Sequence, residues 1–360
     1  MMSDARLTRK QRQDFKAELE TSLPGYIALE NIARGLIANA LNKNDVNFLN
    51  IQSRVKTPDS ADRKLERKKY LNPISEMTDI LGIRVIVYLN SDIDRVENSL
   101  RALFEIDDEK SIDKRKSQRV DQVGYRSLHL ICKLGNSRRS LPEYTDYFEH
   151  CFEVQVRTAL EHAWAEIEHK QNYKSQSQHS LPSELQRRLM IISGTLELVD
   201  QELSSIAAQS SDYHSKIQQG DTSFNSDPLS VVSMVALSSK IADDQGIELD
   251  TEFRNDAALI SLISELNRFG VYTVAEFAAL AQSFPARNIA DGHETNLFGY
   301  VRDIMIANDP MKYFSKVYQN AFTVTEADMP IFDQISEPGK IRRILNELSI
   351  EIDRDETSDW

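Results

Sequence analysis

The segment Cys151–Arg157 carries the clearest chemical pattern in this 360-residue chain, because polar and apolar side chains alternate along it. In a β-strand, this alternation places Glu153, Gln155 and Arg157 on one face and the apolar residues on the other. A carboxylate can act as a base or hold a metal, an amide can orient a sugar or base, and a guanidinium can bind phosphate. The same row could also be a set of structural ion pairs on an exposed sheet face, and the pattern alone leaves both interpretations open.

A second alternating run, Tyr125–Leu134, predicts another strand with Tyr125, Ser127 and His129 on one face. Tyr125 could stack on a nucleobase while His129 contacts phosphate or ribose. The structural alternative is an aromatic cross-strand pair in the core. Gly124, just before the run, permits a close approach of backbone or ligand.

Further charged residues lie before these strands. Asp79 precedes a predicted strand, Ile83–Leu89, and could bind a divalent cation together with Glu153, since Mg²⁺ is held by one or two carboxylates plus substrate phosphates. Arg54 and Lys56 share one face of an extended segment, residues 46–56. Ser60 and Lys64 are i, i+4 neighbours on the helix that Pro58 opens. Arginine suits purine stacking and phosphate binding, and lysine adds point charge for a polyphosphate.

Composition predicts a globular, two-domain chain, with 41% hydrophobic and 28% charged residues. No apolar run reaches the roughly 18 residues that cross a bilayer, and the polar start is unlike a signal peptide, so a cytoplasmic protein without membrane partners is expected. Cys132 and Cys151 are too far apart for a cysteine-based zinc finger. The common nucleotide-binding and hydrolase motifs, such as the Walker loop, are absent from the sequence.

The pattern along the chain predicts two N-terminal helices, residues 8–23 and 26–41, before the strands, and two more helices, 158–173 and 182–205, after them. Together these indicate an α+β domain over residues 1–208. A Ser-, Gln- and Asp-rich linker is expected over 209–229, followed by an all-α domain over 230–360. The net charge of -13 belongs to this last part, since residues 241–360 hold 22 acidic and 10 basic side chains.

Residues 45–174 resemble the RelA/SpoT synthetase family, the enzymes that make the alarmones ppGpp and pppGpp in the stringent response. The resemblance rests on five blocks in the family's order: Arg54-x-Lys56 with Ser60 and Lys64, Asp79-Ile-Leu-Gly-Ile-Arg84, Gly124-Tyr125-Arg-Ser-Leu-His129, Glu153-Val-Gln-Val-Arg-Thr158, and His162-Ala-Trp-Ala-Glu166. Their short spacing is similar to small alarmone synthetases. The resemblance implies a mixed β-sheet flanked by helices, of the nucleotidyltransferase-like type.

The resemblance also implies an activity, the transfer of pyrophosphate from ATP to the ribose 3′-hydroxyl of GDP or GTP. In that picture Glu153 deprotonates the hydroxyl and binds Mg²⁺ together with Asp79. The residues expected to bind ATP are Arg54 and Arg84 around the adenine and Lys56, Ser60 and Lys64 on the phosphates. Those expected to bind the acceptor are Lys114, Tyr125, His129, Gln155 and His162.

One departure from the family pattern concerns the acceptor. A lysine usually found four residues before the tyrosine is Asp121 here, with Arg115, Lys116 and Arg119 as the nearby basic alternatives. The acceptor could therefore also be an adenine nucleotide or the 3′ end of tRNA, as in some toxic relatives, with the acidic domain acting as regulator, protein-partner site or homo-oligomer contact. A synthetase-like module that only binds nucleotide is a third interpretation. Alarmone hydrolysis is not expected, because the chain lacks the His-Asp motif of the family's hydrolase domain.

Overall fold

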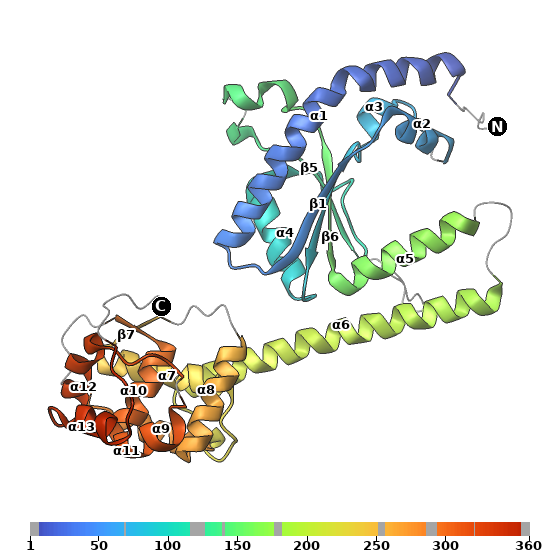
Figure 1. Ribbon diagram of the computed structural model, residues 1–360. Helices are drawn as coiled ribbons and strands as arrows, with labels where there is room; N and C mark the ends of the chain where they lie inside the picture. The colour runs from blue at the N-terminus through green and yellow to red at the C-terminus, as the bar shows by residue number, and fades with distance from the viewer. Residues whose placement is uncertain are drawn as a thin grey trace. The chain divides into compact units, whose positions relative to one another are not determined.

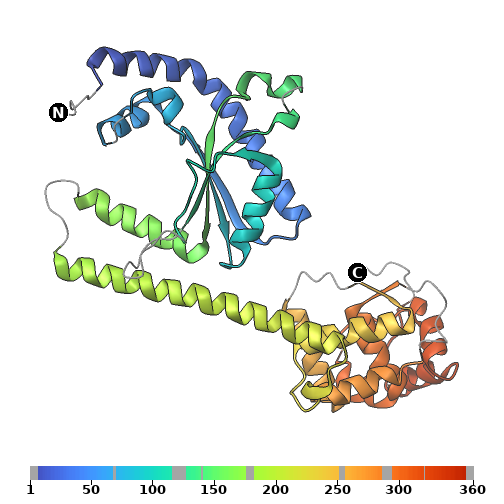
Figure 2. The same cartoon turned by 180° about the vertical axis from the view of Figure 1, so that it is seen from behind.

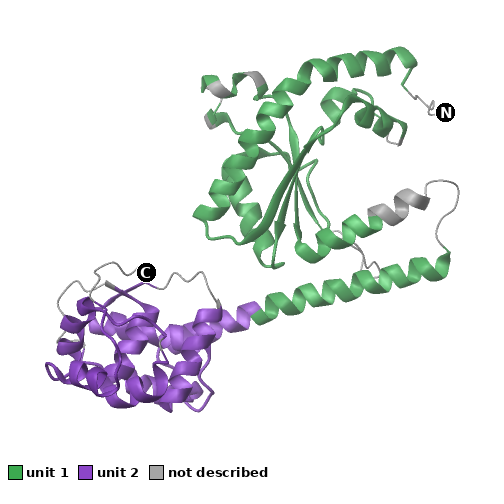
Figure 3. Cartoon of the chain, viewed as in Figure 1, with its two compact units in different colours: residues 1–206 green, residues 207–360 purple. Residues whose placement is uncertain are grey.

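The computed structural model describes residues 7–67, 70–115, 127–138, 141–175, 182–250, 256–285, 294–319 and 321–353. The chain forms two compact units, residues 1–206 and 207–360 (Figure 3). Across the described ranges, no helix combines the length and the apolar character needed to cross a membrane.

Unit 1 is built on one mixed sheet with the strand order β1-β2-β6-β5-β3, and β4 pairs with β5 (Figure 1). Only the β2–β6 pair is parallel among these strands. The strands are β1 (Phe48–Val55), β2 (Leu81–Val87), β3 (Phe104–Ile106), β4 (Ile112–Asp113), β5 (Leu128–Leu134) and β6 (Phe152–Thr158). The helices are α1 (Arg9–Lys43), α2 (Pro58–Arg67), α3 (Pro73–Glu76), α4 (Asp92–Leu103), α5 (Ala159–Ser175) and α6 (Ser183–Gln218), with 3₁₀ turns η1 (Asn136–Arg138) and η2 (Pro142–Tyr147). The α+β class expected from the sequence is confirmed.

The two faces of the sheet differ because apolar and polar residues alternate along its strands. One face is buried beneath α1 and α4, where Ile83, Val154 and Leu130 join the core with Leu29 of α1 and Val96 of α4. Helix α5 lies on the other side, as Figures 1 and 2 both show. That second face keeps its polar side chains and stays partly open, so it can hold a site.

The N-terminal region is one helix, where the sequence predicted two. Pro24 lies inside α1, although proline removes a backbone donor and usually breaks a helix. Leu19 and Tyr26 on either side of Pro24 are both buried in the core of unit 1. Their burial on one continuous face stabilises the helix across the proline. Strands β3 and β4 were not predicted, because two or three residues are too short to show alternation.

The segment expected as a linker is partly helical, since α6 continues to Gln218. Ile217 is buried in the core of unit 2 and Tyr213 packs against that core. Tyr213 and Ile217 thus give the end of α6 one apolar face that packs on the core of unit 2. The Ser- and Gln-rich residues that led to the linker prediction lie on the rest of this helix.

Unit 2 is mostly helical and has its own core. Its elements are η3 (Thr222–Phe224), α7 (Val231–Gln245), α8 (Asp256–Phe269), α9 (Val274–Gln282), α10 (Leu297–Asn308), α11 (Pro310–Lys312), the π-helical turn η5 (Tyr313–Val317), η6 (Glu326–Asp328), α12 (Met329–Ile335) and α13 (Lys340–Glu347). A parallel pair of short strands, β7 (Glu248–Asp250) and β8 (Glu294–Asn296), departs from the all-α expectation. A capping box formed by Thr273 and Glu276 begins α9.

Candidate active site

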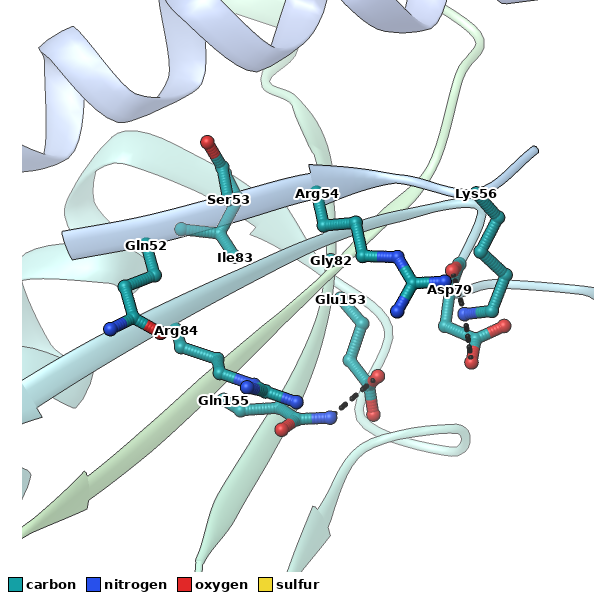
Figure 4. A pocket seen from close by; sticks show the side chains of 10 residues that line it. All are labelled: Gln52, Ser53, Arg54, Lys56, Asp79, Gly82, Ile83, Arg84, Glu153 and Gln155. Atoms are coloured by element: carbon teal, nitrogen blue, oxygen red, sulfur yellow. Dashed lines mark hydrogen bonds and ion pairs between the residues drawn. The ribbon is translucent and has the colours of Figure 1, made fainter. Parts of the chain in front are cut away.

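Two rows of residues cross the open face of the sheet, because the strand register aligns them. The first row contains Arg54 of β1, Gly82 of β2 and Glu153 of β6. The second row contains Gln52, Arg84, Gln155 and His129 in the same strand order, continuing to β5. Residues far apart in the chain therefore meet within two neighbouring rows (Figure 4).

A cavity of about 450 Å³ lies over these rows. Its lining residues are Gln52, Ser53, Arg54, Lys56, Asp79, Gly82, Ile83, Arg84, Glu153 and Gln155. Gly82 forms part of the floor, and a Cβ atom added there would meet no heavy atom within 4 Å. The missing side chain thus leaves room between Arg54 and Glu153. Two arginines, one lysine and two carboxylates facing one space make a site suited to a phosphorylated, metal-bound ligand.

Asp79 holds two lysines at one end of the cavity. Its Oδ2 atom lies 2.7 Å from Lys56 Nζ and 2.5 Å from Lys64 Nζ. Burial alone would raise the pKa of Asp79, but the two lysines outweigh it and hold that pKa below its usual range. Burial lowers the pKa of Lys56 despite its contacts with Asp79, whereas the Asp79 contact outweighs burial and raises the pKa of Lys64.

The other carboxylate oxygen of Asp79, Oδ1, is a possible ligand for a metal ion. Asp79 Oδ1 is buried and has no hydrogen-bond partner among the described residues. A buried, charged oxygen without a partner is costly unless an ion or ligand satisfies it. No group of three or more metal-binding side chains occurs in the described part of the chain. The two carboxylates that line the cavity, Asp79 and Glu153, fit a cation that also takes ligands from phosphate groups.

Glu153 is oriented by two neighbours on the sheet. Its Oε1 lies 2.7 Å from His129 Nδ1, and its Oε2 accepts a hydrogen bond from Gln155 Nε2 at 3.0 Å. Burial would raise the pKa of Glu153, but the hydrogen bonds from His129 and Gln155 outweigh it and lower that pKa. Glu153 is therefore a fixed, ionised carboxylate near neutral pH.

The two arginines that line the cavity are each held by another residue. Arg54 donates a hydrogen bond to Ser60 Oγ at 3.3 Å, which places the α2 residue Ser60 beside β1. Arg84 Nη1 lies 2.9 Å from Glu166 Oε1 on α5. Helix α5 thus fixes Arg84 from above the sheet. With Lys64 held by Asp79, all the residues predicted to bind ATP gather around this cavity.

The residues predicted to bind the acceptor are less completely described. His129 lies 2.5 Å from Ser127 Oγ through one ring nitrogen and contacts Glu153 through the other. Both ring nitrogens therefore have partners within the protein, and the imidazole orients the Glu153 carboxylate. His162 lies in the first turn of α5, where burial and then nearby Arg157 lower its pKa, and its buried Nδ1 has no hydrogen-bond partner within the described ranges. Lys114 follows β4, and its backbone nitrogen donates to the Ser127 carbonyl at 3.1 Å. Tyr125 lies outside the described residues.

Of the basic residues suggested as substitutes for the missing lysine, the structure describes only Arg115. Arg115 is mostly buried and pairs with Asp113 at 2.9 Å and with Asp94 at 2.8 Å. These carboxylates, with burial acting against them, raise its pKa and occupy its guanidinium. Arg115 is therefore not available to bind acceptor phosphate. Lys116, Arg119 and Asp121 lie outside the described residues.

Several residues of the site were given no role in the sequence analysis, among them Glu166, Gly82 and Gln52. Glu166 holds Arg84, Gly82 forms the floor, and Gln52 lines the cavity beside Arg54. Gln52 could have been found by continuing the two-residue period backward from Arg54 along β1. Glu166 belongs to the fifth block of the family resemblance, but its contact with Arg84 was not predictable, since it depends on how α5 crosses the sheet.

The fold and site together define an α+β domain whose open sheet face gathers arginine, lysine and carboxylate side chains around one cavity. The sequence profile described as "Region found in RelA / SpoT proteins" matches residues 53–178. GTP pyrophosphokinase YjbM from Bacillus subtilis (strain 168) is 31% identical over 163 residues, which is 44% of this chain and 72% of that protein. GTP pyrophosphokinase YwaC from the same organism is 31% identical over 159 residues, 43% of this chain and 71% of that protein.

Among solved structures, that of the small alarmone synthetase 1 from Bacillus subtilis is 26% identical, covers 54% of this chain and 98% of that one, and has a TM-score of 0.46. The sequence matches decide the assignment, because each spans most of the relative and the profile contains the site residues from Arg54 to His162. The chain belongs to the RelA/SpoT family.

Proposed function

We propose that the protein transfers pyrophosphate from ATP to the ribose 3′-hydroxyl of GDP or GTP, as a GTP diphosphokinase that makes ppGpp or pppGpp. The curated relatives are GTP pyrophosphokinases, which supports the enzyme class. The observation that carries the proposal is the cavity in which Arg54, Arg84, Asp79 and Glu153 meet. It combines groups for a purine, a polyphosphate, a cation and a hydroxyl nucleophile.

The donor ATP fits the β1–β2 side of the cavity. The guanidinium groups of Arg54 and Arg84 both line it, from neighbouring strands, and can stack on the faces of an adenine. Lys56 and Lys64 would bind the triphosphate, and the Asp79 contacts that now hold both lysines would be exchanged for phosphate oxygens. Ser60, already bonded to Arg54, would add a hydroxyl donor at the start of α2.

We further propose that Mg²⁺ binds between Asp79 and Glu153. The buried Asp79 Oδ1 and the two carboxylates of the cavity support this assignment. When bound, the ion would neutralise charge on the transferred phosphates. Replacing Asp79 by asparagine should weaken the dependence of the rate on Mg²⁺ and lower the rate itself.

Glu153 would orient the attacking 3′-hydroxyl and take its proton. His129 and Gln155 hold its two oxygens, so the carboxylate is positioned before the acceptor binds. Phosphoryl-type transfer requires mainly such positioning together with positive charge around the phosphates. Gln155 and His162 are then left to contact the acceptor nucleotide, with Tyr125 as the predicted stacking residue.

A second candidate function is the pyrophosphorylation of another acceptor, such as an adenine nucleotide or the 3′ end of tRNA. One observation favours it. Arg115 is occupied by Asp94 and Asp113, so it does not replace the lysine that the family pattern places at position 121. An acceptor held mainly by its base and ribose would need fewer phosphate contacts.

The test is a product assay with the full chain, Mg²⁺ and ATP labelled in the β- and γ-phosphates. GDP, GTP, unlabelled ATP and bulk tRNA are supplied as separate acceptors, and the products are separated by chromatography. Labelled ppGpp or pppGpp is the expected result. Label found only in tRNA, or only in adenine nucleotides, would favour the second candidate. No transfer to any acceptor, with ATP still bound, would leave a nucleotide-binding module.

A further inference from the structure

Helix α2 is held from outside the cavity by two basic residues of α1. Arg12 Nε lies 2.7 Å from Asp62 Oδ1, and Arg12 Nη2 lies 3.0 Å from Glu66 Oε1. Lys16 Nζ lies 3.0 Å from Asp59 Oδ1 and 3.4 Å from Asp62 Oδ2. The start of α1 runs beside α2, as Figures 1 and 2 both show. Because Asp62 contacts both basic residues, the two cations and three carboxylates form one network.

The sequence of α2 gives different properties to three sides of the helix. With 3.6 residues per turn, its three acidic residues in this network share the side that meets α1. Ala61 and Leu65 lie on a second side and pack in the core of unit 1. Ser60 and Lys64 lie on a third side, where both have polar contacts with residues that line the cavity. A shift of α2 relative to the sheet would therefore move Ser60 and Lys64 together.

The residues expected to bind the donor come from two separate parts of the fold. Arg54 lies on β1 and Lys56 closely follows that strand, whereas Ser60 and Lys64 lie on α2. One triphosphate can contact both sets only while α2 keeps its distance from the sheet. The contact of Lys64 with Asp79 does not secure that distance, because in the proposed function Lys64 exchanges Asp79 for phosphate oxygens. The ion pairs with α1 involve no residue that lines the cavity, so they persist when the ligand binds.

The start of α1 is itself fixed by a cap and by burial. Thr8 Oγ1 accepts a hydrogen bond from the Gln11 backbone nitrogen at 3.3 Å, and Gln11 Oε1 accepts one from the Thr8 backbone nitrogen at 2.8 Å. These two bonds form a capping box, which stabilises the first turn of a helix. Phe15, between Arg12 and Lys16 in the sequence, is buried in the core of unit 1. Both basic residues therefore project from a part of α1 that is held in place.

We propose that Arg12 and Lys16 are positioning residues for the donor nucleotide, which hold α2 where Ser60 and Lys64 bind the triphosphate and do not touch the ligand themselves. This inference rests on the proposed function, which places ATP in the cavity. The side chains of Arg12 and Lys16 are 31% and 34% exposed, so each pair alone contributes little free energy. The effect belongs to the network around Asp62, whose side chain is only 16% exposed.

The first test is calorimetric titration of the full chain with a non-hydrolysable ATP analogue and Mg²⁺, with circular dichroism as the control for folding. Arg12→Gln should raise the Kd of the analogue about fivefold, and Asp62→Asn should raise it by a similar factor, because both break the same contact. Asp62→Asn separates positioning from a general effect of charge, since removing a carboxylate near a polyphosphate would by charge alone strengthen binding. Unchanged affinity of Arg12→Gln, or tighter binding by Asp62→Asn, would overturn the proposal.

The second test is a double-mutant cycle on the same two residues. Arg12→Gln/Asp62→Asn should bind the analogue about as weakly as Arg12→Gln alone, because the contact is already lost in the single variant. Effects that multiply would show that the residues act separately and would overturn the proposal. Arg12→Lys keeps the charge and should recover most of the parent affinity. The matched control is Lys10→Gln, an exposed lysine on the opposite side of α1, which should bind like the parent; an equal loss there would show a general charge effect and also overturn the proposal.

Binding of AMP gives a readout that a general disturbance of the cavity would not produce. AMP lacks the β- and γ-phosphates, so its affinity depends on Arg54 and Arg84 of the sheet more than on α2, and Arg12→Gln should change it less than about twofold. In the transfer assay, Arg12→Gln should raise the KM for ATP and leave kcat nearly unchanged, because Asp79 and Glu153 do not lie on α2. An equal loss of affinity for AMP and for the analogue would overturn the positioning role.

The parent protein separates failure of this inference from failure of the proposed function. A parent chain that binds neither the ATP analogue nor AMP would refute the placement of ATP in the cavity, and the positioning role with it. A parent chain that binds both, together with an Arg12→Gln variant that binds both equally well, would refute only the role of α1.

Discussion

Glu153 illustrates how one side chain acquires a role from its neighbours. By itself, a glutamate in a strand is a common surface residue. Here His129 and Gln155 each hold one of its oxygens, and Asp79 lines the same cavity. The lowered pKa keeps the carboxylate ionised, which suits a group that binds a cation and orients a hydroxyl. A proton acceptor with a low pKa contributes more by position than by basicity.

Glu153→Gln should therefore reduce kcat by about 10² to 10⁴-fold, the usual contribution of a positioned acid–base group. The amide preserves shape and can still accept a hydrogen bond from His129, so folding should be unchanged. Steady-state kinetics of the transfer reaction measures the effect, with circular dichroism as the control for folding. A variant that keeps a tenth or more of the parent kcat would contradict the role of Glu153 in the reaction.

Gly82 offers a test of the cavity that does not involve a charged group. Its backbone is outside the left-handed region and no atom lies near an added Cβ, so larger residues should fold normally. Gly82→Leu should fill the space between Arg54 and Glu153 and weaken binding of a non-hydrolysable ATP analogue at least tenfold. Gly82→Ala is the matched control and should have a much smaller effect. Calorimetric titration that finds equal affinities for both variants would place the donor elsewhere.

At the scale of elements, the sequence predicts strands better than it predicts what joins them. The two-residue period of residues 151–157 predicted β6 (Phe152–Thr158) and its polar face, because one side of that strand is buried. The meeting of Arg54 with Glu153 was not predictable from either strand alone. It requires the order β1-β2-β6, which tertiary packing decides. The predicted break near Pro24 is wrong, and the first part of the predicted linker, residues 209–218, is helical, since burial of Tyr26 and Ile217 outweighed local preference.

The junction of β6, α5 and α6 contains two acidic residues, the partly buried Glu161 and the buried Asp200. Glu161 Oε2 accepts a hydrogen bond from the Thr158 backbone nitrogen at 3.0 Å, and Asp200 accepts one from the Thr158 side chain. Burial raises the pKa of Glu161 to about 7, and the nearby Asp200 carboxylate adds to the shift, while Arg157 and Arg115 oppose it. Burial also raises the pKa of Asp200, against its hydrogen bond with Thr158.

This pKa makes a prediction about stability and pH. Because the folded state binds the Glu161 proton more tightly than the unfolded state, stability should fall as pH rises from about 4.5 to 7 and the proton is lost. Glu161→Gln removes that dependence and keeps an oxygen for Thr158. The free energy of unfolding of the variant, relative to the parent, should rise by up to about 3 kcal/mol between pH 5 and 8. Urea denaturation at both pH values measures it, and a constant difference would place the Glu161 pKa near its ordinary value.

At the scale of the whole molecule, the chain contains two separate hydrophobic cores. One is formed by described residues between Phe15 and Val156, the other by residues between Ile217 and Leu345, and no residue belongs to both. The candidate site is built only from the first unit. Two cores without shared residues should unfold in two steps, since a single cooperative transition requires the parts to stabilise each other.

Differential scanning calorimetry of the full chain should show two transitions that respond to different changes. A non-hydrolysable ATP analogue with Mg²⁺ should raise only the transition of unit 1, because a ligand stabilises the part that binds it. Phe277→Ala, which empties a fully buried position in unit 2, should lower only the other transition, at a cost of about 3 to 5 kcal/mol. Phe277→Leu is the milder control and should lower it less. If the analogue raised both transitions equally, the two cores would be energetically coupled, and the acidic unit would contribute directly to nucleotide binding.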